Sequence, residues 1–198
     1  MKKVLVIVDM VNGFVNEGAL ADKRINNITP NIIKLIESGQ FRAIFAFRDC
    51  HNKDDEEFKT FPPHCLKGTR ESELIPELKK YEQFFMDIPK QTTNGFKSEN
   101  FKKFWKKHSG EEIEFAVTGC CTDICVRDFS QSLVKDIKQK QSPARVVVLE
   151  DCVSTFDSPS HNAQLVGDVA IQEMADMGIE ISNCEKYLSE ILSEYEQN

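Results

Sequence analysis

Short runs of apolar and β-branched residues alternate along the chain with longer segments of helical spacing. Runs at 3–8, 42–47, 114–118 and 145–149 have the length and composition of buried strands. Apolar positions recur every three or four residues at 28–38, 98–107, 123–137 and 161–177, as in helices that cover a core. A run at 180–181 predicts a further strand, and 186–194 a closing helix. The alternation predicts a single domain over residues 1–198, an α/β three-layer sandwich whose mostly parallel central sheet is flanked by helices.

Reactive side chains follow the predicted strands. In a parallel sheet, ligands bind outside the carboxyl ends of the strands, where these side chains are expected to meet. The residues at these positions are Asp9 and Met10, then Arg48, Asp49 and His51, then Gly119, Cys120 and Cys121, and finally Glu150 and Asp151. The sequence therefore predicts a functional site at one edge of the sheet.

Composition narrows the class of protein. The 198 residues are 40% hydrophobic and 29% charged, and the net charge of −7 argues against a nucleic-acid binder, which normally carries a basic face. No apolar run approaches the roughly 20 residues that cross a membrane, and no signal-peptide pattern opens the chain, so a cytoplasmic location is expected. The seven cysteines are then expected to be thiols, each either a packing residue or a reactive group.

One cysteine stands where a nucleophile could be activated. The segment 118–125 reads Thr-Gly-Cys-Cys-Thr-Asp-Ile-Cys, in which a strand ends, glycine permits a turn, and Thr122 or Asp123 can cap a helix. Cys125 then lies in the first helical turn, where backbone N–H groups lower a thiol pKa and can hold an oxyanion. The alternative is a small buried core residue, and Cys120 and Cys121 by themselves read as turn and packing residues.

Carboxylate and imidazole groups gather in the segment 49–64. Asp49 and His51 are two residues apart and point the same way in an extended chain, and Glu57 and His64 follow. Such ligands suit zinc, manganese or ferrous iron. Asp54, Asp55 and Glu56 compete with Glu57 for the third ligand position, and a solvated polar loop is the alternative to a metal site.

Asp9 and Lys90 are two further candidates. Asp9 stands at the carboxyl end of a predicted strand, where a carboxylate can act as a general base or merely cap a turn. Lys90 follows Ile88 and Pro89, and a lysine in such a position is either functional or a solvated surface residue.

Five motifs together resemble the isochorismatase-like cysteine hydrolases and, within them, the nicotinamidases. In chain order they are Asp9-Met10-Val11-Asn12-Gly13-Phe14, Asp49-Cys50-His51, His64-Cys65-Leu66-Lys67-Gly68-Thr69, Pro89-Lys90 and Thr122-Asp123-Ile124-Cys125-Val126. Each motif alone is weak, but their order and spacing over most of the chain make the resemblance specific. It implies the isochorismatase-like hydrolase fold.

The resemblance also implies the roles of individual residues. It implies a catalytic triad of Asp9, Lys90 and Cys125. It implies one divalent metal ion, zinc first with manganese or iron as alternatives, on Asp49, His51, Glu57 and His64. A cis peptide between Cys120 and Cys121 is implied as well, with the N–H groups of Cys121 and Cys125 directed at the oxyanion. Phe14 and Cys120 are expected in the substrate pocket.

The implied activity is hydrolysis of nicotinamide to nicotinate and ammonia through a cysteine thioester, in NAD salvage, with pyrazinamide as a further substrate. Related enzymes often form homo-oligomers. Cys50 stands where many members have tryptophan, so an aromatic wall of the pocket is expected to be weaker. The alternatives are a family hydrolase acting on a different small amide, and a catalytically silent metal-binding or redox-sensing protein. The sequence assigns no role to Cys50, Cys65, Cys152 or Cys184.

Overall fold

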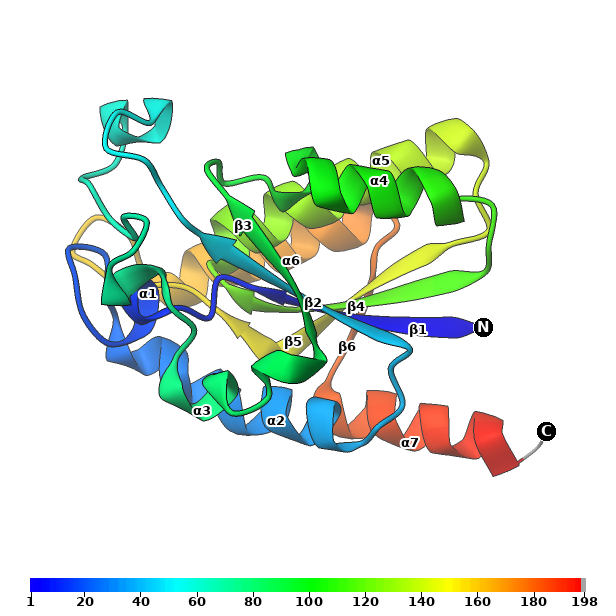
Figure 1. Ribbon diagram of the computed structural model, residues 1–198. Helices are drawn as coiled ribbons and strands as arrows, with labels where there is room; N and C mark the ends of the chain where they lie inside the picture. The colour runs from blue at the N-terminus through cyan, green and yellow to red at the C-terminus, as the bar shows by residue number, and fades with distance from the viewer. Residues whose placement is uncertain (197–198) are drawn as a thin grey trace.

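A six-stranded, wholly parallel sheet forms the centre of the computed structural model, which describes residues 1–196 (Figure 1). The strand order is β3-β2-β1-β4-β5-β6, and every neighbouring pair is parallel. The strands are β1 (Lys2–Val8), β2 (Ala43–Asp49), β3 (Phe85–Lys90), β4 (Ile113–Cys120), β5 (Arg145–Ser154) and β6 (Glu180–Ser182). The chain enters at the centre of the sheet, builds one edge with β2 and β3, and then the other with β4 to β6.

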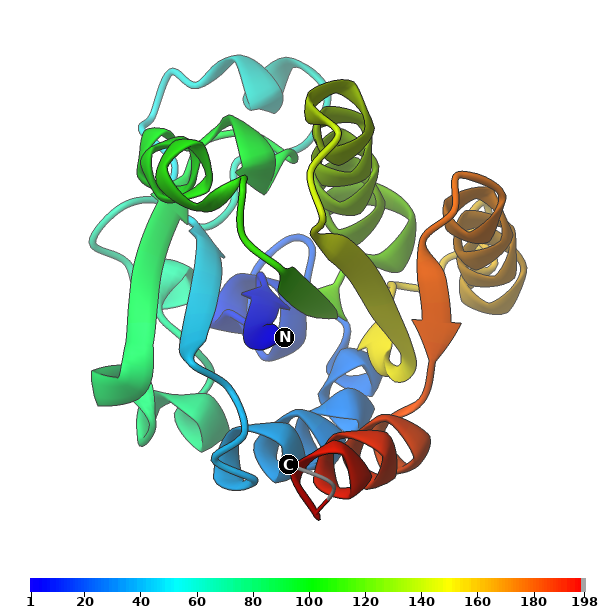
Figure 2. The same cartoon turned by 90° about the vertical axis from the view of Figure 1, so that its right-hand side faces the viewer.

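Helices cover both faces of the sheet, as Figures 1 and 2 show. They are α1 (Asn12–Val15), α2 (Thr29–Glu37), α3 (Pro76–Lys79), α4 (Glu99–His108), α5 (Arg127–Lys140), α6 (Ala163–Asp176) and α7 (Cys184–Glu196). One face carries α4, α5 and α6, and the other carries α2, α3 and α7. The predicted three-layer α/β sandwich is thus confirmed. Within residues 1–196, no helix combines the length and the apolar composition of a membrane span.

Side-chain alternation along β1 divides the core into two layers. Leu5 and Ile7 pack with residues of α2 and α7, whereas Val4, Val6 and Val8 pack with residues of α4 and α5. Successive side chains of a strand point to opposite faces, so a strand that is buried on both sides reads as a continuous apolar run. This is why the central strands could be found from the sequence.

The edge strand β3 was missed from the sequence. Only Ile88 and Lys90 are buried in Phe85–Lys90, and Pro89 interrupts the run. Proline is tolerated in β3 because the strand lies at the edge of the sheet, with β2 as its one neighbour. A strand with one partner and little burial carries too weak an apolar signal to be recognised.

The strand β5 is longer than predicted, which corrects two placements. Glu150 and Asp151 lie inside Arg145–Ser154 as exposed residues rather than beyond its end, and neither joins the functional site described below. The register between β4 and β5 shifts between Val117 and Gly119. Gly119 has a φ of +106°, and a Cβ there would lie 2.0 Å from the carbonyl oxygen of Val8. Glycine is therefore required where β4 passes the end of β1.

Candidate active site

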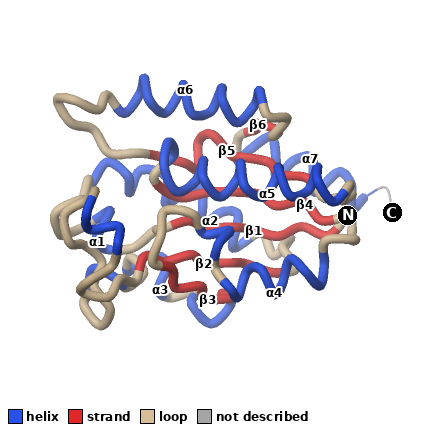
Figure 3. Tube along the Cα trace, turned by 90° about the horizontal axis from the view of Figure 1, so that it is seen from above, coloured by secondary structure: helices blue, strands red, loops and turns tan. Residues whose placement is uncertain are grey.

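The carboxyl ends of β1, β3 and β4 bring the predicted triad together. Asp9 follows β1, Lys90 is the last residue of β3, and Cys125 lies in a π-helical turn (Thr122–Val126) between β4 and α5. Loops gather at this end of the sheet (Figure 3). The peptide bond between Cys120 and Cys121 is cis, as the resemblance implied. Residues more than 80 positions apart along the chain thus meet because parallel strands end at one edge.

Lys90 is the centre of this group. Its Nζ lies 2.7 Å from Asp9 Oδ2 and 3.9 Å from Cys125 Sγ, and it also pairs with Asp49 Oδ1. Asp9 adopts a left-handed φ of +51°, a conformation in which aspartate is enriched, and its Oδ1 accepts a hydrogen bond of 2.9 Å from the backbone N–H of Asp49. The carboxylate is therefore fixed between the lysine and the backbone of β2.

Burial and neighbouring charges set the ionisation of the triad. Burial, together with repulsion from Asp49, raises the pKa of Asp9 to about 7. Burial opposes a charged Lys90, but the carboxylates of Asp49 and Asp9 hold its pKa well above the usual value. Burial also raises the pKa of Cys125 well above that of a free thiol, and Lys90 offsets this only in part. Burial of the sulfur thus opposes the lowering of the thiol pKa that is expected at the start of a helix.

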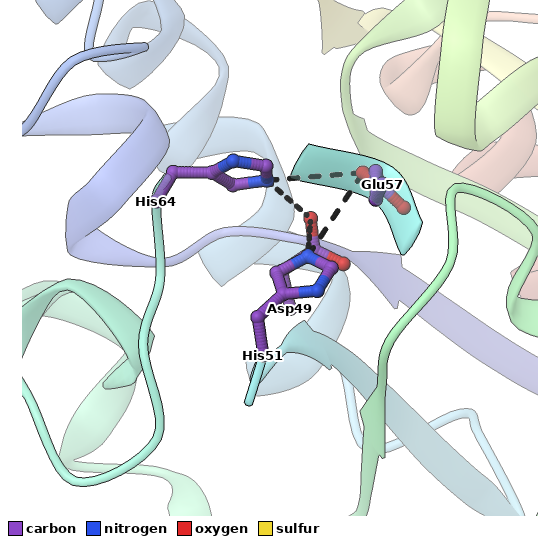
Figure 4. A group of neighbouring side chains, drawn as sticks. All are labelled: Asp49, His51, Glu57 and His64. Carbon is purple, nitrogen blue, oxygen red and sulfur yellow. Dashed lines mark ion pairs between the residues drawn. The ribbon is translucent and has the colours of Figure 1, made fainter. Parts of the chain in front are cut away.

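The four predicted metal ligands converge beside the triad (Figure 4). One ligand atom from each of Asp49, His51, Glu57 and His64 lies within 4.8 Å of every other. Nε2 of His64 and Nε2 of His51 lie 3.5 and 3.6 Å from Asp49 Oδ2. The same two nitrogens lie 3.8 and 3.9 Å from Glu57 Oε1. These separations are too long for hydrogen bonds.

The donor set fits a divalent cation. Atoms about 2.0–2.2 Å from a zinc ion stand roughly 3.3–3.6 Å apart in a tetrahedral site, only slightly closer than the atoms observed here. Asp49 Oδ2 and His51 Nε2 are buried and have no hydrogen-bond partner among residues 1–196. Buried polar atoms normally have a partner, and a cation would supply it.

Hydrogen bonds on the far side of each imidazole orient both rings. Nδ1 of His51 faces Asp55 Oδ2 at 3.1 Å, and Nδ1 of His64 faces the carbonyl oxygen of Pro62 at 2.8 Å. Both partners are acceptors, so Nδ1 donates and Nε2 keeps its lone pair toward the centre of the group. Asp55, a competitor of Glu57 in the sequence, therefore supports a ligand, and Glu57 lies with the ligand atoms.

A small cavity of about 50 Å³ lies between the two groups. Its lining includes the metal-ligand candidates Asp49, Glu57 and His64 and also Cys121 and Cys125. The rest of the lining consists of Phe14, Leu20, Phe61, Thr93, Ile124 and Phe156. A mostly apolar lining with a few polar groups is typical of a site for a small organic molecule.

Comparison with known proteins identifies the family. The isochorismatase domain matches residues 3–183. The chain belongs to the isochorismatase family. It is 36% identical to Nicotinamidase 1 of Arabidopsis thaliana over 181 residues, which cover 81% of this chain and 72% of that protein. Within the family, the chain is thus an amidohydrolase of the nicotinamidase type.

Solved structures of isochorismatase-like proteins share the fold. An isochorismatase-like hydrolase from Alkaliphilus metalliredigens superposes with a TM-score of 0.78 at 23% identity, covering 96% of this chain and 98% of the other. A pyrazinamidase from Pyrococcus horikoshii, solved in complex with zinc, has a TM-score of 0.69 at 23% identity, covering 92% and 99% of the two chains. At this identity the likeness shows that the folds are the same, and it carries no statement about individual site residues.

Three residues near this isochorismatase-family site differ from the sequence-based expectation. Cys120 was expected in the substrate pocket, but its side chain is fully buried in the core, and its thiol donates to the carbonyl oxygen of Asp9 at 3.2 Å. Thr122 and Asp123 were candidate helix caps, but no side chain caps the π turn. Asp123 accepts hydrogen bonds from Thr155 and His161 instead.

Several aromatic and apolar residues of the cavity were not expected from the sequence. Phe61 and Phe156 both line it, so the cavity has aromatic walls although Cys50 stands where many members have tryptophan. Phe61 belongs to the Phe-Pro-Pro-His stretch before His64, and Phe156 follows the end of β5. Phe156 could have been predicted from its place just after a strand, but the apolar run does not show where β5 ends.

Proposed function

We propose that this protein hydrolyses nicotinamide to nicotinate and ammonia through a thioester on Cys125, with a divalent metal ion held by Asp49, His51, Glu57 and His64. The observation that carries the proposal is that Cys125 and three of these four residues line the same cavity. A small aromatic amide with a second polar atom on its ring can reach both groups at once. The 36% identity to a plant nicotinamidase supports this choice of amide.

Proton transfer from Cys125 to Asp9 begins the proposed reaction. The raised pKa of the thiol prevents spontaneous ionisation near neutral pH, whereas Asp9, with a pKa raised to about 7, can accept a proton under the same conditions. Lys90 lies within 4 Å of the sulfur and stabilises the thiolate as it forms. The sulfur then bonds to the carboxamide carbon.

Collapse of the tetrahedral adduct breaks the carbon–nitrogen bond. Asp9 returns the proton to the leaving nitrogen, ammonia departs, and the thioester remains. Water then attacks the thioester as Asp9 takes one of its protons, and the proton passes to Cys125 as the acid is released. The backbone N–H groups of Cys121 and Cys125 are the proposed donors to the oxyanion in both steps.

The proposed metal site orients the substrate. A divalent cation supplies Lewis acidity there and favours a lone pair such as that of a pyridine nitrogen. Zinc is the first candidate, because two imidazoles and two carboxylates suit it and a structural neighbour was solved with zinc. Manganese and iron bind the same ligand types.

Ammonia release from nicotinamide tests the proposal directly. Benzamide is the matched control substrate, because it has the same carboxamide on a six-membered ring without the nitrogen. We expect rapid release from nicotinamide, slow release from benzamide, and turnover of pyrazinamide. A protein that releases no ammonia from nicotinamide, or that hydrolyses benzamide equally well, contradicts the proposed substrate and favours another small amide.

Two cysteine variants test the covalent step. We expect Cys125→Ala to reduce turnover by about 10⁴-fold or more, because the reaction loses its nucleophile. Cys152→Ala is the control, since Cys152 is buried in β5 away from the cavity. Acid quenching during turnover should leave a nicotinoyl group on Cys125, detected by mass spectrometry. Wild-type turnover in Cys125→Ala would exclude the thioester.

The broader expectations remain proposals. We propose that the chain acts as one domain, serves pyridine nucleotide salvage in the cytoplasm and assembles as a homo-oligomer. The shared sheet and the domain match over residues 3–183 support the first of these.

A further inference from the structure

The loop between β5 and α6 forms one wall of the cavity and has a feature that the proposed chemistry does not use. Phe156 lines the cavity, and its ring stacks on that of His161 with 3.9 Å between centroids and 6° between planes. One face of the aromatic wall is therefore covered by an imidazole. Unlike an apolar residue at this position, a histidine can also donate hydrogen bonds and carry a positive charge.

His161 is held between two hydrogen-bond acceptors. Its Nδ1 lies 2.9 Å from the carbonyl oxygen of Phe156, and its Nε2 lies 2.8 Å from Asp123 Oδ2. A neutral imidazole has one N–H and can satisfy only one of them, whereas an imidazolium satisfies both. Partial burial lowers the pKa of His161, but the hydrogen bonds to Asp123 and to the Phe156 carbonyl outweigh it and raise the pKa above the usual value.

Asp123 connects this loop to the nucleophile. It lies in the π turn two residues before Cys125, and its Oδ1 accepts a hydrogen bond of 2.6 Å from Thr155 Oγ1. One carboxylate thus holds the residues on both sides of Phe156, at positions 155 and 161. The wall of the cavity and the turn that carries the thiol are therefore one hydrogen-bonded unit.

The other charged groups of the segments around this loop do not compete for the ring. Arg24 pairs with Asp157 at 3.1 Å and with Asp22 at 2.6 Å, which connects the far side of the loop to the short 3₁₀ helix (Lys23–Ile28) that precedes α2. Three carboxylates line a separate hollow with Thr122 and Thr155: Glu150, Asp151 and Asp168.

We propose that His161 is a positioning residue whose imidazolium, held by Asp123, fixes Phe156 as the wall against which the aromatic ring of the substrate packs. The inference rests on the proposed function and adds a determinant of substrate affinity. His161 touches neither the thiol nor the triad, so it acts on binding rather than on the chemical step. Affinity is then expected to weaken as pH rises through the pKa of His161.

Steady-state kinetics of His161→Phe test this role. The variant keeps an aromatic ring beside Phe156 and loses both hydrogen bonds. We expect KM for nicotinamide to rise about tenfold while kcat stays within about threefold. His108→Ala is the matched control, since His108 also contacts a phenylalanine (Phe104, 4.6 Å) and a carboxylate (Glu111, 2.9 Å), but on α4. An unchanged KM, or a fall in kcat at constant KM, overturns the proposal.

A pH series separates positioning from simple packing. Between about pH 6 and about pH 9, KM of the wild type should rise more steeply than KM of His161→Phe, because only the wild type loses the imidazolium. Parallel profiles of the two proteins contradict the inference.

Histidine NMR titration gives a readout that needs neither turnover nor a stable His161→Phe variant. The His161 signal should titrate above the usual value in the wild type and shift downward in Asp123→Asn. An unshifted signal contradicts the inference. If the wild type releases no ammonia from nicotinamide, the proposed function fails, whatever the titration shows.

Discussion

Two buried charged clusters lie at opposite ends of the same sheet. At the amino ends of the strands, Glu114 accepts hydrogen bonds from Lys3 at 3.1 Å and Tyr187 at 2.6 Å through Oε1, and from Arg145 at 2.6 Å through Oε2. At the carboxyl ends, Asp9, Asp49 and Lys90 form the other cluster. β1 contributes to both, because Lys3 lies near its start and Asp9 follows its end.

The clusters differ in whether their charges are satisfied. Both oxygens of Glu114 have donors, and these hold the pKa of the buried carboxyl below its usual value despite the burial that would raise it. In the other cluster, Asp9 has a raised pKa, and Asp49 Oδ2 has no hydrogen-bond partner among residues 1–196. A satisfied network stabilises the fold, whereas an incompletely satisfied one leaves atoms available for a proton, a substrate or a cation.

Asp9→Asn is expected to give the largest effect at the carboxyl ends. Asparagine tolerates the left-handed backbone at this position and can still accept the N–H of Asp49, but it cannot take a proton from Cys125. We expect turnover of nicotinamide to fall by about 10²–10⁴-fold. The free energy of unfolding should stay within about 1 kcal/mol of the wild type or exceed it, because the repulsion between Asp9 and Asp49 is removed.

Ammonia assays and urea unfolding on the same Asp9→Asn sample provide the measurement. A large loss of stability with little loss of turnover would show that Asp9 mainly stabilises the fold, as Glu114 is expected to do. The two clusters would then not differ in function.

Glu114→Gln should give the opposite result at the amino ends. Removing one partner of a buried charge network takes away the carboxylate with which Lys3 pairs at 3.1 Å, and we expect unfolding to become easier by about 3–5 kcal/mol. Because the change lies at the far end of β4, kcat of the folded enzyme should be unchanged. The exposed Glu112→Gln is the matched control. Equal stability of the two variants would show that the buried network contributes little.

Burial also explains which elements of the fold could be predicted from the sequence. Central strands such as β1 could be predicted because they are buried on both faces. Most candidate site residues could then be found just after the carboxyl ends of these strands. The edge strand β3 and the full length of β5 could not, because exposed polar residues interrupt their apolar runs. The cluster around Glu114 could not be predicted, because Lys3 and Glu114 look like ordinary surface charges in the sequence. Only the pairing of β1 with β4 brings them together.

The geometry of the site was less predictable than its residues. The separation of the ligand atoms, the support from Asp55 and the elevated pKa of Cys125 depend on tertiary burial. Phe156 and His161 show the same limit, because the stack between them depends on the loop after β5.

Asp55→Asn gives the smallest expected effect and tests how far the incompletely satisfied cluster extends. Asp55 Oδ2 faces Nδ1 of His51 and also accepts from the N–H of Asn52 at 2.9 Å. A neutral amide at this position weakens the hold on the imidazole without removing a ligand. We therefore expect metal affinity to fall by about 10–100-fold, as measured by competition with a chelating dye, with unfolding of the metal-free protein unchanged.

Asp54→Asn is the matched control for this variant, since Asp54 is exposed and adjacent in sequence. Metal affinity that is equal in the two variants would mean that His51 is oriented without Asp55, and that the cluster built for binding ends at its four converging side chains. A loss confined to Asp55→Asn would instead show that a surface carboxylate of the 49–64 segment belongs to it. The functional cluster then differs from the structural one in a second respect, because one of its carboxylates orients a metal ligand, whereas the donors around Glu114 satisfy both oxygens of a buried carboxylate.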